Sequence, residues 1–153
     1  MERDHARLAR LLQASIDSDF TPLIYNEFRT GLLRHIAIEE KLLFPNLRSN
    51  EELTAVLTQL RLQHGALGAL LVPKATRQIV QAIQQMLEQH NKLEEGDEGV
   101  YSKIVFTGNE GEILSTIKAF PDVPLSAAID KLTDMGPVRR AMERAGINSE
   151  YYF

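Results

Sequence analysis

The chain has no cysteine among its 153 residues, so disulfide bonds, thiolate metal sites and cysteine nucleophiles are excluded. It also has no apolar run of about 18 residues, so we expect no membrane-spanning helix. The first five residues, MERDH, are charged and lack the apolar stretch typical of a secretion signal. These absences favour a reducing, cytoplasmic location.

The charge balance is mildly acidic. The net charge is −4 and the isoelectric point is near 5.6, which disfavours non-specific binding to nucleic acid or to a membrane surface. We therefore expect neither as a partner. Hydrophobic residues make up 44% of the chain, enough for one globular domain with a sizeable core.

Helical spacing of the apolar residues predicts an all-α protein, an up-down-up-down four-helix bundle with short additional C-terminal helices. The bundle helices are expected over residues 3–17, 22–47 and 50–71 and from residue 76 onward, where Val100, Tyr101, Ile104 and Phe106 would continue the fourth. Residues 1–106 would form the bundle, and 107–153 a helical extension packed on it.

Capping residues mark the expected turns. Thr21 precedes Pro22, Ser49 precedes Glu52 by three positions as in a capping box, and Thr76 follows a proline-containing break. In the extension we expect helices over 110–119, capped by Asn109, over 125–134, and over 137–145.

All four histidines of the chain fall into one pattern with two glutamates. The pattern is His5, His35-x-x-x-Glu39, His64 and His90-x-x-x-Glu94. A spacing of four residues places two side chains on the same helix face. Each of these residues also continues an apolar seam, such as Phe28, Leu32 and Leu42 in the second helix, so we expect the six to face the bundle interior.

Simple arithmetic places the histidines at one level. Residues on adjacent antiparallel helices share a level when they are equally distant from the connecting turn. The point halfway between His5 and His35 is residue 20, the next falls at residues 49 and 50, and the last at residue 77. All three coincide with turns assigned from capping and proline chemistry alone.

A buried layer of four imidazoles and two carboxylates favours a metal site. A single histidine on an apolar face is more often a core residue, and a single His-x-x-x-Glu pair is more often an intrahelical contact. The joint pattern is much harder to explain without a cation, since buried charges need partners. Its donors suit iron, zinc, manganese or copper, and six donors are too many for one tetrahedral zinc, so two metals fit better.

At these residues the sequence resembles the hemerythrin-like proteins with the HHE cation-binding domain. The six residues carry the resemblance, supported by the flanking segments 39–45, 94–95 and 100–101, and it covers roughly residues 3–105. It implies a four-helix bundle with a non-haem di-iron centre that handles oxygen or a related small molecule. By the same resemblance, Glu39 and Glu94 would bridge the metals, and the histidines would be terminal ligands.

One departure from the family concerns the third helix. Oxygen carriers of this family have a second histidine four residues from the first on that helix, whereas Leu60 and Gly68 flank His64 at that spacing. This departure argues against reversible oxygen carriage. We therefore expect a protein that binds or senses oxygen, nitric oxide, peroxide or iron, and we favour this role over catalysis. The alternatives are a di-metal oxidoreductase acting on a small oxidant and a structural bundle with zinc or manganese.

Several other residues were assigned structural roles from the sequence. Glu40 and Glu95 are expected to be solvated helix-face charges, with support of the neighbouring ligands as the alternative. Tyr25 and Tyr101 are redox-capable, but we expect them to be packing residues. The aromatic end, residues 151–153, is expected to pack on its own chain, with a homodimer as the alternative.

Overall fold

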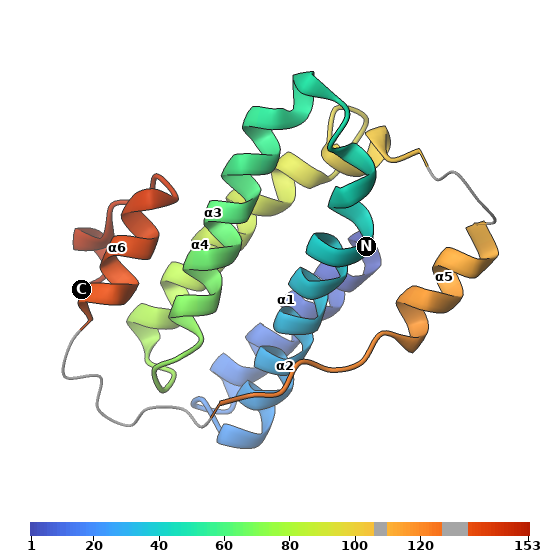
Figure 1. The fold of residues 1–153 in the computed structure, drawn as a ribbon. Helices are drawn as coiled ribbons and strands as arrows, with labels where there is room; N and C mark the ends of the chain where they lie inside the picture. Colours follow the sequence, from blue (N-terminus) through green and yellow to red (C-terminus); the bar gives the residue numbers. More distant parts are fainter. Residues whose placement is uncertain (106–109, 127–134) are drawn as a thin grey trace.

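The structure is a computed structural model that describes residues 1–105, 110–126 and 135–153. Four long helices form the up-down-up-down bundle, as predicted (Figure 1). They are α1 (Glu2–Asp17), α2 (Pro22–Ile38), α3 (Thr54–Leu70) and α4 (Arg77–Glu94). The described residues contain no strand, and none of their helices is long and apolar enough to cross a bilayer.

Caps define two of the bundle turns. The Thr76 side chain accepts a hydrogen bond from the Ile79 backbone N–H at 3.2 Å, which confirms the predicted start of α4. The capping box on Ser49 was wrong, because Asn50 caps the third helical segment instead and its side chain accepts from the Glu52 N–H at 3.1 Å. This cap leads into a short 3₁₀ turn before α3 begins.

The second helix does not stay regular to residue 47, as the sequence had suggested. After α2 ends, the chain forms a π-helical turn over Glu39–Leu43 and then a 3₁₀ turn over Phe44–Leu47. The Phe44 N–H bonds to the Glu39 carbonyl five residues back, and Pro45 has no N–H to restore the α-helical pattern. A π turn of this kind often occurs at a functional site.

This wider turn shifts the buried face by one residue. Leu42, predicted to lie in the seam, is only half-buried, whereas Leu43 and Phe44 are buried. The Phe44 ring consequently stacks on the His64 imidazole, with centroids 5.6 Å apart and planes 6° from parallel.

Two apolar clusters fill the bundle, one on each side of the histidine level. One includes Leu8, Leu32, Leu67 and Met86. The other is smaller and includes Ile38, Leu60 and Phe44. The polar layer between them is thus closed off by apolar side chains above and below.

The fourth helix ends earlier than predicted. It stops at Glu94, and after a loop the chain forms a 3₁₀ turn over Val100–Lys103. The proposed continuation through Val100, Tyr101 and Ile104 was therefore wrong, and Phe106 lies outside the described residues. Gly96 has a φ of +78°, which ends the helix because L side chains rarely adopt that conformation.

Two further helices follow. The helix predicted over 110–119 is present as α5 (Glu110–Ala119), although its predicted cap, Asn109, lies outside the described residues. The helix predicted over 125–134 falls mostly on residues 127–134, which are also outside them. The helix predicted over 137–145 is present as α6 (Gly136–Arg144), and Gly146 follows it with a φ of +79°.

The extension contacts the bundle at both of its helices. α6 packs against α3. Arg34 of α2 donates hydrogen bonds to the carbonyls of Phe120 (2.9 Å) and Ile117 (2.8 Å), so it satisfies the free carbonyls at the end of α5. Tyr152 and Phe153 pack against the larger core cluster, whereas Tyr151 is exposed. The division into two domains remains a prediction.

Candidate metal centre

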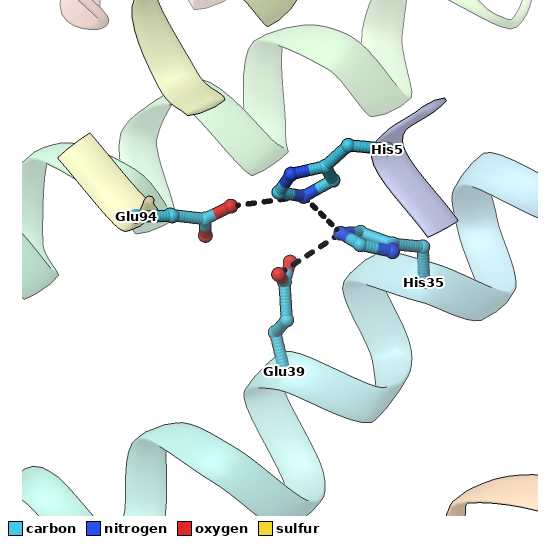
Figure 2. Close-up of side chains that lie close together, drawn as sticks. All are labelled: His5, His35, Glu39 and Glu94. Carbon is cyan, nitrogen blue, oxygen red and sulfur yellow. Dashed lines mark hydrogen bonds and ion pairs between the residues drawn. The ribbon is translucent and has the colours of Figure 1, made fainter. Parts of the chain in front are cut away.

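The structure brings all six sequence-predicted side chains to one buried layer. They form two groups whose donor atoms lie within 4.8 Å of one another. One group is His5, His35, Glu39 and Glu94, whose side chains point toward one another in Figure 2. The other is His64 and His90 with the same two glutamates. All six are buried, and Glu39 and Glu94 are 0% exposed.

The two glutamates connect the two groups atom by atom. Glu39 places Oε1 3.0 Å from His35 Nε2 and Oε2 3.1 Å from His64 Nε2. Glu94 places Oε2 3.3 Å from His5 Nε2 and Oε1 3.2 Å from His90 Nε2. Each carboxylate therefore gives one oxygen to each histidine pair, as a bridging carboxylate must. We call the two locations the His5–His35 position and the His64–His90 position.

Within each position the histidine nitrogens face each other closely. His5 Nε2 lies 2.9 Å from His35 Nε2, and His64 Nε2 lies 3.3 Å from His90 Nε2. Two nitrogen ligands about 2.1 Å from one cation lie about 3.0 Å apart at a right angle. The spacing thus fits a pair of imidazoles that share a metal ion.

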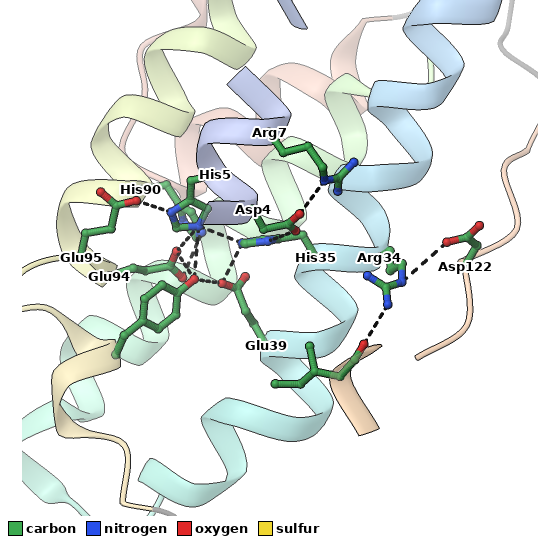
Figure 3. Close-up of polar contacts among 12 residues, drawn as sticks. Asp4, His5, Arg7, Arg34, His35, Glu39, His90, Glu94, Glu95 and Asp122 are labelled. Atoms are coloured by element: carbon green, nitrogen blue, oxygen red, sulfur yellow. Dashed lines mark hydrogen bonds and ion pairs between the residues drawn. The ribbon is translucent and has the colours of Figure 1, made fainter. Parts of the chain in front are cut away.

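Four acceptors behind the histidines orient these nitrogens, and Figure 3 shows two of them, Asp4 and Glu95. Each histidine Nδ1 lies close to one of them: His5 with Glu95 (2.5 Å), His35 with Asp4 (2.9 Å), His64 with Glu40 (2.8 Å) and His90 with Gln63 (3.0 Å). Because a carboxylate or amide oxygen only accepts, Nδ1–H must donate. The Nε2 lone pair then points into the centre, as is typical of metal-binding histidines.

That arrangement leaves the centre in need of positive charge. Facing lone pairs on two imidazoles repel each other unless a proton or a cation lies between them. Glu39 Oε2 and Glu94 Oε1 are buried without a hydrogen bond, although each lies near a histidine nitrogen. Donor atoms that converge without satisfying one another fit a bound cation.

Electrostatics indicate that protons fill this role when no metal is present. Burial by itself would lower the pKa of His35 and His64, but Glu39 and the carboxylates behind the two rings outweigh it and raise both to about 9. Burial would raise the pKa of Glu39, yet the two histidines hold it well below its usual range. Protonated imidazoles can thus balance the buried carboxylates, and a metal would displace those protons.

Sequence reasoning missed or misjudged several of these residues. Asp4 and Gln63 were not considered. Glu40 and Glu95, expected as solvated charges with a supporting role as the alternative, are partly exposed and each contacts a histidine. Each of the four stands next to a candidate ligand in the sequence, which is the signal that could have identified them.

The two tyrosines also have different environments. Tyr25 is a packing residue, as predicted: it is 3% exposed and its ring stacks near Phe28. Tyr101 is not, because its hydroxyl donates to Glu39 Oε1 and lies 2.9 Å from Glu94 Oε2 and 3.2 Å from His5 Nε2. Burial, followed by the two adjacent carboxylates, raises its pKa above the ordinary value of 10.0.

The positions that flank His64 supply no further donor. Leu60 is fully buried in the smaller apolar cluster, and Gly68 has no side chain. Each position therefore has two histidine nitrogens and two carboxylate oxygens. A cavity of about 240 Å³ reaches His5, His35 and His90, and its wall includes Leu8 and Leu87.

The comparison with known families gives a match over most of the chain. The family model described as the hemerythrin HHE cation binding domain matches residues 1–98, which include all six candidate ligands. Neither the curated proteins nor the solved structures gave a significant match.

Proposed function

The chain belongs to the hemerythrin HHE cation-binding family, and from that premise we propose that it binds two metal cations, one at each histidine pair. The family and the buried His/Glu cluster together suggest metal binding. One observation carries the proposal of two cations: the two oxygens of each glutamate face different histidine pairs. One oxygen of Glu39 and one of Glu94 thus face each pair.

We propose iron as the metal at both positions, which makes the centre a non-haem di-iron site. Imidazole and carboxylate donors suit iron, and they also suit zinc and manganese. With two nitrogen and two oxygen donors, each position leaves coordination open to a small ligand. Bound iron would supply the redox chemistry. The chain itself orients the histidines, bridges the two positions and excludes bulk water with its two apolar clusters.

The cavity beside the centre supports a role in binding or sensing a small molecule. The wall of this cavity is mostly apolar, with Leu12 and Leu32 among its residues and a polar part at Gln13, Gln84, Glu88 and Asn91, and it leads to imidazoles of both positions. Oxygen, nitric oxide and hydrogen peroxide are small and uncharged, so such a wall would not oppose their entry. The geometry thus favours binding or sensing of one of these ligands over a purely structural metal site.

Two measurements test the function. Metal analysis of protein purified without added metal should find about two equivalents of iron, and His90→Ala should reduce this content. Anaerobic ferrous protein should change its visible absorption on exposure to oxygen, nitric oxide or peroxide. Zinc or manganese in place of iron would identify a structural bundle, and catalytic turnover of one of these molecules would identify an oxidoreductase. Iron-loaded protein that responds to none of the three would refute the sensing role.

Location and self-association are also proposals. The absence of cysteine supports a cytoplasmic location. Tyr151 is 83% exposed beside the packed Tyr152 and Phe153, and it is the residue we would assign to a homodimer contact. Light scattering of wild-type protein and of Tyr151→Ser tests that assignment, and a monomeric wild-type mass would reject it.

A further inference from the structure

The Tyr101 hydroxyl lies on one side of the centre only. Its three polar neighbours, His5 Nε2, Glu39 Oε1 and Glu94 Oε2, are three of the four inward-facing atoms of the His5–His35 position. At the other position, the ring stacked on His64 is that of Phe44, which has no donor atom. The two positions therefore have the same kinds of donor, two imidazole nitrogens and two carboxylate oxygens, but different neighbours.

The loop after α4 places the Tyr101 hydroxyl beside the His5–His35 position. Gly96 reverses the chain with its positive φ. At Gly99, a Cβ would lie 2.2 Å from the Glu95 carbonyl oxygen and 2.4 Å from that of Glu94, so no side chain fits. Val100 is then buried in the smaller apolar cluster, which fixes the 3₁₀ turn that bears the tyrosine. The placement of the hydroxyl thus depends on close backbone packing.

The acceptors behind the histidines add a second difference between the positions. Both histidines of the His5–His35 position donate to carboxylates, those of Glu95 and Asp4. In the other position His64 donates to a carboxylate, but His90 donates to the neutral amide of Gln63. A carboxylate behind a histidine makes it a more basic ligand than an amide does.

Resting on the proposed two-cation function, we propose that the Tyr101 oxygen is a fifth protein donor at the His5–His35 position, and that this position fills first. A tyrosine oxygen is an established iron ligand once it has lost its proton, and a bound cation would release that proton to water, as metal binding does for other protein ligands. The hydroxyl already lies within hydrogen-bonding distance of three of the atoms that converge on the cation. The additional oxygen and the additional carboxylate both favour the same position, so the two binding steps should be unequal.

The test compares Tyr101→Phe with wild type, with Tyr25→Phe as the matched control. Tyr25 is a buried tyrosine whose hydroxyl has no partner and which belongs to the apolar core. Protein loaded with ferrous iron and then oxidised in air should show a tyrosinate-to-iron absorption band with tyrosine ring modes in its resonance Raman spectrum. Tyr101→Phe should lose both signals and retain bound iron, whereas Tyr25→Phe should keep both.

Calorimetric titration of metal-free protein with Zn²⁺ tests the order of filling. Wild type should bind in two unequal steps, and Tyr101→Phe should weaken the tighter step by at least about tenfold, the lower end for loss of a metal-supporting group. If Tyr101→Phe binds two cations with the same binding steps and the same ferric spectrum as wild type, this inference is overturned and the proposed two-cation function stands. Weakened zinc binding without a tyrosinate signal in wild-type ferric protein would also overturn it, because Tyr101 would then act through hydrogen bonds. A wild-type protein that binds no metal would overturn the proposed function itself.

Discussion

Replacing Glu39 with Gln tests the bridged centre most directly. Glu39 is fully buried, and its two oxygens face histidines on different helices and in different positions. The amide removes the negative charge with little change of shape. If the carboxylate bridges two cations, Glu39→Gln should weaken binding at both positions, and titration should show both steps shifted.

The same substitution has a calculable cost in the metal-free protein. It removes the buried partner of two histidines whose pKa it raises. Removing one partner of a buried ion pair costs about 3–5 kcal/mol. For a domain of this size, 1 kcal/mol corresponds to about 2–4 °C in melting temperature, so the metal-free variant should melt about 6–20 °C lower. Differential scanning calorimetry with and without Zn²⁺ measures both effects.

Glu40→Gln is the matched control, because Glu40 is the adjacent glutamate and its side chain is 31% exposed. It contacts only His64 of the two histidine pairs, so only the step of the His64–His90 position should weaken, by about 10–100-fold. Two unshifted binding steps in Glu39→Gln would refute the bridging role. Equal effects of the two substitutions on both steps would refute the assignment of donors to separate positions.

Three further predictions concern the surroundings of the centre. His35 and His64 have a pKa near 9 in the folded metal-free protein against an ordinary 6.5, so their contribution to stability is full below pH 6.5 and is lost as the pH approaches 9. Urea denaturation of metal-free protein at a series of pH values should show this decline. Gln63→Glu should strengthen the weaker Zn²⁺ step by about tenfold in calorimetric titration, because it adds a carboxylate behind a histidine. Gly99→Ala should cost about 1–3 kcal/mol in urea denaturation and abolish the ferric tyrosinate signal, since its Cβ would overlap two carbonyl oxygens; the control Gly68→Ala, where a Cβ meets nothing within 4 Å, should do neither.

The bundle and the convergence of the six residues were predictable because both depend on local rules. Helical periodicity identifies the inward face of each helix. Because the turns between antiparallel helices are short, the level of a residue along the bundle follows from the number of residues between it and the turn. The π turn at Glu39 was not predictable in this way, because it changes backbone hydrogen bonding and leaves the side-chain pattern looking regular. It is also why Leu43 replaced Leu42 in the core.

Tyr101 was missed for a different reason. Its position follows from the loop that contains Gly96 and Gly99, and a helical pattern does not describe such a loop. The helix predicted from residue 76 onward runs through both glycines to Tyr101. The positive φ of Gly96 and the close backbone contact at Gly99 instead end the helix and return the chain to the centre.

The four outer acceptors follow a rule that helix geometry explains. On α1 and α3 the acceptor precedes the inward histidine, as Asp4 and Gln63 do, whereas at the ends of α2 and α4 it follows the inward glutamate, as Glu40 and Glu95 do. Adjacent residues on a helix differ by about 100° around its axis, so each acceptor points sideways toward a neighbouring helix. Neighbouring helices of the bundle run in opposite directions. Moving to the preceding residue on one helix and to the following residue on the next therefore rotates the side chain in the same direction around the bundle.

Each helix therefore supports the histidine of the next one, and the last supports the first: Asp4 serves His35, Glu40 serves His64, Gln63 serves His90, and Glu95 serves His5. These four contacts form a closed outer ring around the bundle. The ring closes only if each of the four helices keeps its rotation about its own axis. Rotating one helix would break two contacts, the one that its acceptor makes and the one that its histidine makes. The outer ring thus fixes the orientation of the donors more firmly than apolar packing alone, which tolerates substitution and small rotations at modest cost.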